Sequence, residues 1–228
     1  MTEVVQINAH TWRIEDGFVR FFLLEGKEKA LLLDTGANTP DALSIASKLT
    51  ELPTILMNTH ADPDHISGNA SFEKVYMHPS EEDNYRAHGG KCEIIPVADG
   101  EEINLGERII KIIATPGHTP GSICIIDKDA RVLYSGDTVS DSDIYMFGER
   151  RNIHNFIESL SKLDSMKNAF EEIYPCHGTT ILKNTAPASI KAAAESIVAG
   201  KATSVPIEMF GRPVALYKFD CCGFFCDR

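Results

Sequence analysis

Four side chains able to bind a metal ion fall within the six residues from His60 to His65. They belong to one continuous stretch, Thr59-His60-Ala61-Asp62-Pro63-Asp64-His65-Ile66-Ser67-Gly68. An apolar run at residues 54–57 precedes this stretch and predicts a strand. Pro63 and its polar neighbours argue against a helix, so the stretch is predicted to be a tight loop that turns several side chains toward one centre. The chain is therefore expected to fold around a strand end that presents a ligand-rich loop.

The same arrangement recurs three times later in the chain, where a predicted strand runs into a loop with a ligand-type residue beside a glycine. These loops contain His118, Asp137 and His177. Binding residues concentrate in loops at strand ends, and glycine permits the sharp turns and close backbone approach that such loops need. We expect all three side chains to take part in binding.

Short apolar runs separated by turn residues predict a strand-rich chain with a few long helices. The predicted strands lie at residues 18–24, 30–33, 54–57, 74–77, 93–97, 108–114, 122–126, 131–134 and 171–174, with a closing apolar segment at 213–219. Helical periodicity appears at residues 40–50, 152–166 and 186–199. This pattern suits two packed sheets covered by helices on their outer faces, and we expect residues 1–228 to form one domain.

Taken together, these segments resemble the metallo-β-lactamase superfamily. Its sequence landmarks occur here in order: Asp34-Thr35-Gly36, the His60 to His65 cluster, His118, Asp137 and His177. The resemblance covers about residues 18–180 and implies an α+β fold, a four-layer αββα sandwich.

The resemblance also implies a centre of two divalent metal ions. The ligands would divide into His60, Asp62 and His118 for one ion and Asp64, His65 and His177 for the other, with Asp137 bridging both. Asp34 would be a carboxylate that orients ligands by hydrogen bonding without touching the metal.

Asp62 departs from the family pattern, which most often has histidine at this position. Three carboxylates and a hydroxide would balance the charge of two divalent ions, whereas the two-carboxylate version leaves one positive charge for activating water. We therefore expect Asp62 to weaken the Lewis acidity of the centre. An added oxygen ligand also shifts preference from zinc toward iron or manganese, although the affinity order favours zinc. Zinc is the expected metal, with iron or manganese as alternatives.

Similarity to the glyoxalase II-like branch favours hydrolysis. It is carried by residues 115–122 and 135–138, and it implies cleavage of a small ester, thioester or lactone by a hydroxide that bridges the metals. Asp64 is the expected catalytic residue, orienting this nucleophile and accepting its proton.

Two other functions remain open. The run Asp62-Pro63-Asp64-His65-Ile66-Ser67-Gly68 also resembles the diiron domain of flavodiiron proteins, which implies reduction of oxygen or nitric oxide with electrons from a separate donor. A non-catalytic sensor that only holds metal is the third possibility.

Charge and composition restrict the partners of the chain. The formal net charge of −11 disfavours nucleic acid and anionic membranes, so a small-molecule substrate is expected. The first residues lack a secretory signal and no stretch is apolar enough to span a membrane, which indicates a cytoplasmic protein. Six cysteines in this compartment are expected to be free thiols. Nothing indicates the oligomeric state.

Several residues near these motifs have plainer interpretations. Cys176 is expected to pack beneath the His177 loop rather than bind metal, and the cysteines of residues 221–226 are expected in the core. Arg150 and Arg151 follow the Asp137 loop, where substrate contact and a charge cluster at a helix start are equally consistent with the sequence. Surface or packing roles are expected for His10, His78, His88 and His154.

Overall fold

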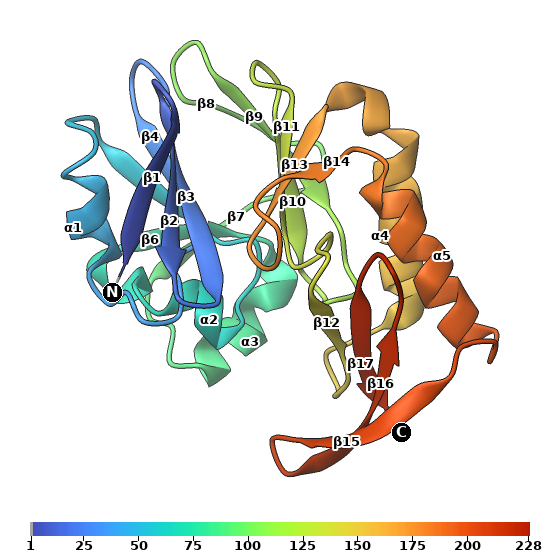
Figure 1. The fold of residues 1–228 in the computed structure, drawn as a ribbon. Coiled ribbons are helices and arrows are strands. Elements are labelled where there is room, and N and C mark those ends of the chain that lie inside the picture. Colours follow the sequence, from blue (N-terminus) through green and yellow to red (C-terminus); the bar gives the residue numbers. More distant parts are fainter. Residues whose placement is uncertain (1) are drawn as a thin grey trace.

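A computed structural model describes residues 2–228 (Figure 1). The N-terminal part forms a seven-stranded sheet in the order β1-β2-β3-β4-β5-β6-β7. Its pairs are antiparallel from β1 to β4 and parallel from β4 to β7. The strands are β1 Glu3–Asn8, β2 Thr11–Asp16, β3 Val19–Glu25, β4 Ala30–Leu33, β5 Thr54–Met57, β6 Lys74–Met77 and β7 Glu93–Pro96.

The middle of the chain forms a second, six-stranded sheet in the order β14-β13-β11-β10-β9-β8. Neighbouring strands are antiparallel except β11 and β13, so β9, β11 and β13 run in the same direction. The strands are β8 Glu102–Asn104, β9 Ile109–Ala114, β10 Ile123–Asp127, β11 Val132–Gly136, β13 Glu172–Pro175 and β14 Leu182–Lys183.

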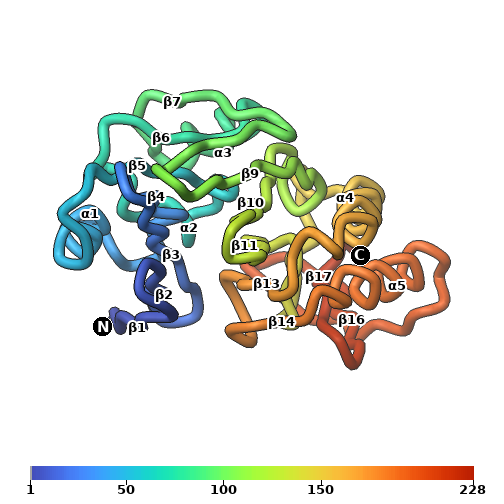
Figure 2. Tube along the Cα trace, turned by 90° about the horizontal axis from the view of Figure 1, so that it is seen from above, coloured from blue at the N-terminus to red at the C-terminus, as the bar shows by residue number. Residues whose placement is uncertain are grey.

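These two sheets pack face to face, and their inner faces form one apolar core. Phe22 and Leu33 of the first sheet belong to the same buried cluster as Ile112 and Tyr134 of the second. Figure 2 shows the two layers side by side when the molecule is viewed from above. Burial on both faces explains why β3, β4, β10 and β11 consist mostly of apolar residues.

Helices cover the outer faces of both sheets, which confirms the predicted αββα sandwich (Figure 1). On the first sheet these are α1 Ala42–Ala46, α2 Pro63–Ile66 and α3 Glu82–Ala87, with the 3-10 turns η1 Asn69–Ser71 and η2 Pro79–Glu81. On the second sheet they are α4 Ile153–Ser165 and α5 Ala186–Val198, with the 3-10 turn η3 Lys167–Ala169. Asn152 begins α4 by accepting the N–H groups of His154 and Asn155 through its side chain.

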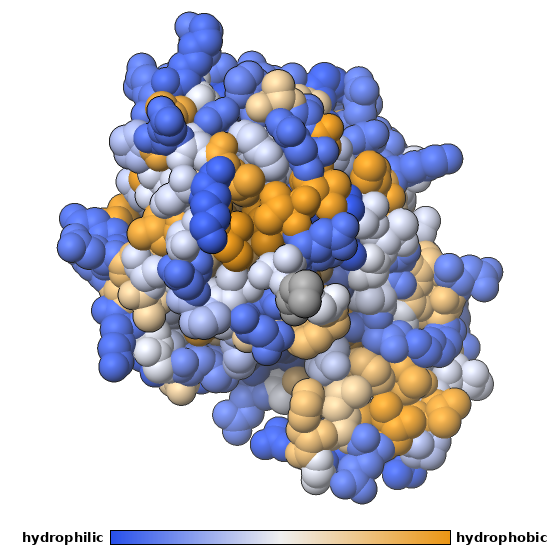
Figure 3. Space-filling view, turned by 60° about the vertical axis from the view of Figure 1, so that its left-hand side comes forward, coloured by the Kyte–Doolittle hydropathy of each residue, from blue (hydrophilic) through white to orange (hydrophobic). Residues whose placement is uncertain are grey.

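The C-terminal segment adds a third sheet that the sequence did not predict. Its order is β12-β17-β16-β15, from β12 Asp143–Met146, β15 Ser204–Met209, β16 Arg212–Lys218 and β17 Gly223–Asp227. The core under α4 joins it to the second sheet, since Phe224 meets Phe156 edge to face at 6.1 Å. In Figure 3 the lobe at the bottom of the view, at the height of this sheet in Figure 1, carries apolar residues among hydrophilic ones.

The structure corrects two predictions of secondary structure. The helix predicted at residues 40–50 is confined to Ala42–Ala46. The ligand-rich stretch contains one helical turn, Pro63–Ile66, where only a loop was predicted. Proline sits at the start of this turn, where its missing N–H has no partner to lose.

Other predictions about the chain as a whole have different outcomes. All six cysteines are free, as predicted. Among residues 2–228 no helix has the length and apolar character needed to cross a membrane. The single-domain organisation stays a prediction.

Candidate metal centre

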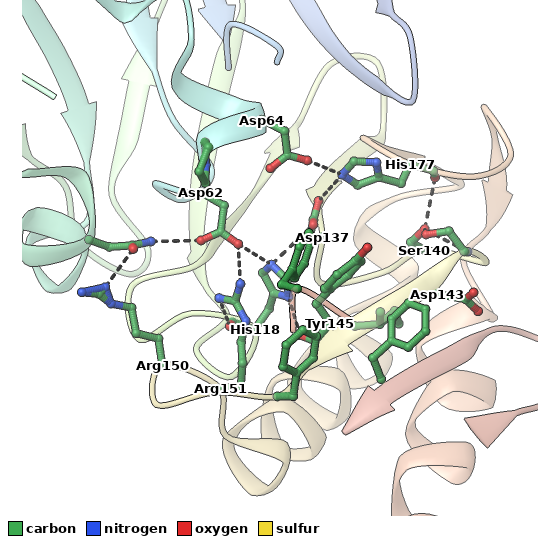
Figure 4. Close-up of a pocket in the computed structure, with 18 of the residues that line it drawn as sticks. Asp62, Asp64, His118, Asp137, Ser140, Asp143, Tyr145, Arg150, Arg151 and His177 are labelled. Carbon is green, nitrogen blue, oxygen red and sulfur yellow. Dashed lines mark hydrogen bonds and ion pairs between the residues drawn. The ribbon is translucent and has the colours of Figure 1, made fainter. Parts of the chain in front are cut away.

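The predicted ligands lie at one edge of the sandwich, in loops contributed by both sheets. Figure 4 labels five of them, Asp62, Asp64, His118, Asp137 and His177. The His60 to His65 stretch follows β5 of the first sheet. His118, Asp137 and His177 follow β9, β11 and β13, the three strands of the second sheet that run in one direction and therefore end at one edge. All seven predicted ligands are brought together, although they span residues 60–177.

One group of side chains surrounds a first position. The Nε2 atoms of His60 and His118 lie 3.7 and 3.4 Å from Oδ2 of Asp62. The same two nitrogens lie 4.0 and 3.4 Å from Oδ2 of Asp137. These are spacings between atoms that could share one metal ion, since each would then lie about 2 Å from it.

A second group faces the other oxygen of Asp137. Oδ1 of Asp137 lies 3.3 Å from Nε2 of His65 and 3.3 Å from Nε2 of His177. Oδ2 of Asp64 completes the group at 3.7 and 3.3 Å from these nitrogens. The two oxygens of Asp137 thus face different groups, which is the arrangement a bridging carboxylate would have.

Each imidazole is oriented by a hydrogen bond on its far side. Nδ1 of His118 donates to the carbonyl of Tyr145 at 3.1 Å, and Nδ1 of His177 donates to the carbonyl of Phe18 at 2.9 Å. Because a neutral imidazole that donates through Nδ1 carries its lone pair on Nε2, these two rings in their neutral form direct that lone pair toward the centre.

Asp34 orients the remaining two imidazoles from beneath. Its Oδ2 accepts from Nδ1 of His65 at 3.0 Å and from the hydroxyl of Thr59 at 2.8 Å. Since that hydroxyl donates to Asp34, it accepts from Nδ1 of His60 at 3.0 Å. Asp34 is fully buried, with a φ of 64° that aspartate tolerates better than most residues. It lies where the resemblance predicted an orienting carboxylate.

Several buried atoms at the centre are left without a hydrogen-bond partner in residues 2–228. They are Nε2 of His60, His65 and His118, and Oδ1 of Asp137. Nε2 of His65 is close to this oxygen, but the pair lacks hydrogen-bond geometry. Unpartnered buried polar atoms are costly, and here they all face one space lined by nitrogen and carboxylate donors. This donor set fits divalent metal ions.

Burial and neighbouring charges shift the pKa values of the centre in different directions. Burial alone would lower the pKa of His177, yet Asp137 and Asp64 raise it to about 10. Burial and the neighbouring His65 lower the pKa of His60 to about 4. Burial would raise the pKa of Asp137, but His177 and His65 hold it well below its usual range. Metal cations would replace protons in this arrangement.

Asp62 has surroundings that the sequence did not reveal. Arg151 donates to its Oδ2, and Asn84 of α3 donates to its Oδ1 at 3.0 Å. Arg151 also donates to the carbonyl of His118 at 2.6 Å, and Arg150 donates to Asn84 at 2.9 Å. Arg151 is therefore tied to two of the predicted ligands, a role outside the alternatives raised for it from the sequence.

Cys176 lies beneath the second group of side chains rather than within it. Its Sγ is buried 3.6 Å from Oδ2 of Asp34, and burial raises the pKa of this thiol to about 12. Cys176, Asp34 and His65 are close enough to form a metal cluster of their own. Nδ1 of His65 already donates to Asp34, however, which leaves no imidazole lone pair on that side. The predicted packing role fits better.

A cavity of about 1000 Å³ opens over the centre. One side of it is an aromatic wall, defined here as Tyr145, Phe147, Phe210 and Phe225. Ring centroids lie 5.0 Å apart for Tyr145 and Phe225 and 6.4 Å apart for Tyr145 and Phe210. Phe210 is 81% exposed at the tip of the β15 to β16 hairpin. Sequence reasoning missed this wall because the third sheet that builds it was not predicted.

The sequence of the chain matches a described family over most of its length. The sequence model of the Metallo-beta-lactamase superfamily matches residues 14–178. The chain belongs to the metallo-beta-lactamase superfamily. This membership confirms the family resemblance, and together with relatives named as a thioesterase and a hydrolase it confirms the prediction of a metal-dependent hydrolase.

Other members of the superfamily are similar to the chain in sequence or in structure. Acyl-coenzyme A thioesterase MBLAC2 of Gallus gallus is 27% identical over 196 residues, covering 68% of this chain and 71% of the relative. Hydroxyacylglutathione hydrolase of Francisella tularensis subsp. novicida (strain U112) is 28% identical over 162 residues, covering 68% of this chain and 61% of the relative. A metallo-beta-lactamase from Pontibacter korlensis superposes with a TM-score of 0.75 at 15% identity, covering 86% of this chain and 99% of that one. This likeness confirms the metallo-beta-lactamase fold.

Proposed function

We propose that this superfamily member holds two divalent metal ions, zinc in the first instance, and hydrolyses a thioester that carries an apolar acyl group. One observation carries the metal part of the proposal: buried imidazole nitrogens without hydrogen-bond partners converge on carboxylate oxygens within 3.3 to 4.0 Å. The proposed ligands are His60, Asp62, His118, Asp64, His65 and His177, with Asp137 bridging.

The thioester part of the proposal is supported by the relatives. One is named an acyl-coenzyme A thioesterase and the other a hydroxyacylglutathione hydrolase. Both names describe an acyl group carried on the sulfur of a larger thiol. Esters and lactones, the other expected substrates, share the reacting carbonyl but lack this sulfur leaving group.

Bound divalent ions would polarise the substrate carbonyl and lower the pKa of a bound water. The chain supplies the remaining functions. Asp64 uses Oδ2 in its contacts with His65 and His177, and we assign its carboxylate the task of orienting the attacking water and accepting its proton. Asp137 and Asp34 keep the imidazoles around them in fixed orientation.

The aromatic wall is the proposed site for the acyl group. It belongs to the same cavity as His118 and Asp137, so a substrate carbonyl at the centre would place its acyl chain beside the wall. The wall is joined directly to the centre, because the carbonyl of Tyr145 accepts from His118. Burial of an apolar chain contributes about 0.8 kcal/mol per methylene, which gives the wall a measurable influence on chain-length preference.

Tyr145 also offers a hydroxyl group to the cavity. Burial, together with Asp64 and Asp143, raises the pKa of Tyr145, so the phenol stays protonated at neutral pH and can donate a hydrogen bond. We assign this hydroxyl a contact with the polar part of the substrate near the thioester.

The first test is metal analysis of protein purified without added metal, together with an optical spectrum and a thioester hydrolysis assay. We expect about two zinc ions per chain and no visible absorbance. Hydrolysis of acyl thioesters should stop after treatment with a chelator and return when zinc is added. Protein that binds no metal after reconstitution would contradict the proposal at its base.

The same measurement addresses the redox alternative. Two iron ions with visible ligand-to-metal absorbance, and no thioester turnover by the zinc form, would favour chemistry on oxygen or nitric oxide. Metal binding without turnover of either class of substrate would favour a sensor.

A further inference from the structure

Arg151 makes contacts that are specific to the first of the two proposed metal positions. One of its terminal nitrogens pairs with Oδ2 of Asp62, and the other donates to the backbone carbonyl of His118. The side chains of Arg151 and Asp62 are each only 15% exposed, so solvent screens this pair weakly. Figure 4 shows the guanidinium of Arg151 between Asp62 and His118.

The backbone fixes Arg151 in this position. Its N–H donates to the carbonyl of Gly148 at 3.1 Å, and the next residue, Asn152, donates its N–H to the carbonyl of Gly117 at 2.8 Å. The segment that begins α4 is thus hydrogen-bonded to the loop that carries His118. These contacts hold the backbone of Arg151 beside the His118 loop.

The contact leaves Asp62 free to bind a metal ion. Each carboxylate oxygen can accept along more than one direction, so Oδ2 can serve a guanidinium and a cation together. Oδ2 also faces Nε2 of His118 at 3.4 Å, which places it on the side of the centre. Asn84 holds Oδ1 from the α3 side at 3.0 Å.

The contact between Arg151 and Asp62 affects the net charge of the proposed metal centre. Three carboxylates against two divalent ions leave one positive charge before a hydroxide binds, whereas the two-carboxylate pattern leaves two. The fixed positive charge of Arg151 brings the net charge of the centre in this chain back to two positive charges. The weaker Lewis acidity that the sequence predicted for the centre took only the charge of Asp62 into account, without that of Arg151.

We propose that Arg151 is a charge-compensating residue, and that the Asp62–Arg151 pair takes the place of the neutral histidine usual in the family. The inference rests on the proposed metal ligation. It differs from a purely structural role in the sign of its effect on metal binding. Removing a compensating cation strengthens metal binding, whereas removing a residue that only positions Asp62 weakens it.

A four-protein cycle tests this sign. The proteins are the wild type, Arg151→Gln, Asp62→His and the double variant, and the measurement is the Zn²⁺ dissociation constant by competition with a chromophoric chelator. Arg150→Gln is the matched control, because it removes the same charge from the neighbouring position, where the side chain contacts Asn84 instead of Asp62. Thermal unfolding of the metal-free proteins checks that each variant is folded.

We expect Arg151→Gln to bind one of the two Zn²⁺ ions about tenfold more tightly than the wild type, and Arg150→Gln to change the affinity for that ion by less than about threefold. Asp62→His alone should loosen that Zn²⁺ about tenfold, because it leaves Arg151 uncompensated beside the metal. The double variant should return to within about threefold of the wild type.

Unchanged or weaker Zn²⁺ binding by Arg151→Gln overturns the inference, and so does a double variant that binds no better than Asp62→His. These outcomes are distinct from failure of the proposed function, in which the wild type itself would bind no Zn²⁺. If Asp62→His does not fold, the comparison of Arg151→Gln with Arg150→Gln still decides the sign.

Discussion

The buried carboxylate of Glu81 accepts the backbone N–H of Gly121 at 2.7 Å. Its other oxygen accepts the N–H of Ala61 at 2.9 Å, immediately after His60. Gly121 belongs to the loop that carries His118, so one side chain fixes the spacing between two ligand loops that come from different sheets. Glu81 also accepts from Asn84, which in turn holds Asp62.

Glu81→Gln should destabilise both the fold and the centre. Glutamine has one acceptor oxygen where glutamate has two, so one of the two backbone N–H groups would face an amide donor. We expect the free energy of unfolding to fall by about 1 to 3 kcal/mol, measured by urea denaturation of the metal-free protein. Zn²⁺ affinity should fall as well. Glu82→Gln, an exposed change on the next residue, should have neither effect, and equal behaviour of the two variants would contradict the role assigned to Glu81.

Asp34→Asn should weaken metal binding without unfolding the chain. Asparagine fits the positive φ of position 34, but it loses the charged acceptor for Nδ1 of His65. Loss of such an orienting partner costs about 10- to 100-fold in metal affinity, which dialysis against a chelator series would measure. Asp41→Asn at an exposed site provides the control. Full retention of both ions by Asp34→Asn would show that Asp34 does not orient ligands.

Phe210→Ala should change chain-length preference with little change in turnover of short substrates. Phe210 lies at the exposed tip of its hairpin and contributes to the aromatic wall, away from the proposed ligands. We expect kcat/KM for long-chain acyl thioesters to fall about tenfold while the value for an acetyl thioester stays within about twofold. Val205→Ala, on the neighbouring strand β15, removes a comparably exposed apolar side chain and serves as the control. An equal loss for short and long chains would remove the wall from the acyl site.

Asp99→Asn should reduce stability at neutral pH and have no effect in acid. Partial burial raises the pKa of Asp99, but Lys162 of α4 and the N–H of Ala114 lower it further, so its net pKa lies below the usual value. The stabilisation is therefore present above the unfolded-state pKa of about 4 and is lost as pH falls through the lower folded-state pKa. Because Asp99 is half exposed, we expect a loss of only about 0.5 kcal/mol.

Urea unfolding of Asp99→Asn and wild type at about pH 7 and at the lowest pH at which both proteins remain folded would show this convergence. The exposed Asp83→Asn variant should track the wild type at both values. A difference that persists unchanged at the lower pH would mean that the ion pair with Lys162 is not its source.

Strands of the sandwich could be predicted from sequence where both faces are buried. Ala30–Leu33 and Thr54–Met57 coincide with predicted runs, because every residue in a doubly covered strand tends to be apolar. The first strand, Glu3–Asn8, is an edge strand with mostly exposed side chains and gives no such signal. The hairpin strand Ser204–Met209 is hidden for the same reason.

The candidate centre could likewise be predicted only in part. Its ligand types and their order were readable, because several local motifs each carried a ligand beside a turn. The pairing of Arg151 with Asp62 was not readable, since 89 residues separate the two and only the packing of the two sheets brings them together. Glu81 and Asn84 belong to a short helical segment with no motif of its own, so their contacts with the ligand loops are likewise a product of tertiary structure.

The apolar core between the two sheets sets the distance between the ligand loops at their edge. The first sheet carries the ligands His60, Asp62, Asp64 and His65, and the second sheet carries His118, Asp137 and His177. The separation of the two sheets therefore determines the separation of these two sets of ligands. A residue such as Leu33 or Ile112, which has no contact with a substrate to make, nevertheless belongs to the packing that sets this gap. Substitutions that change the volume of that packing would therefore shift the ligands relative to one another, although the substituted residues lie away from the substrate.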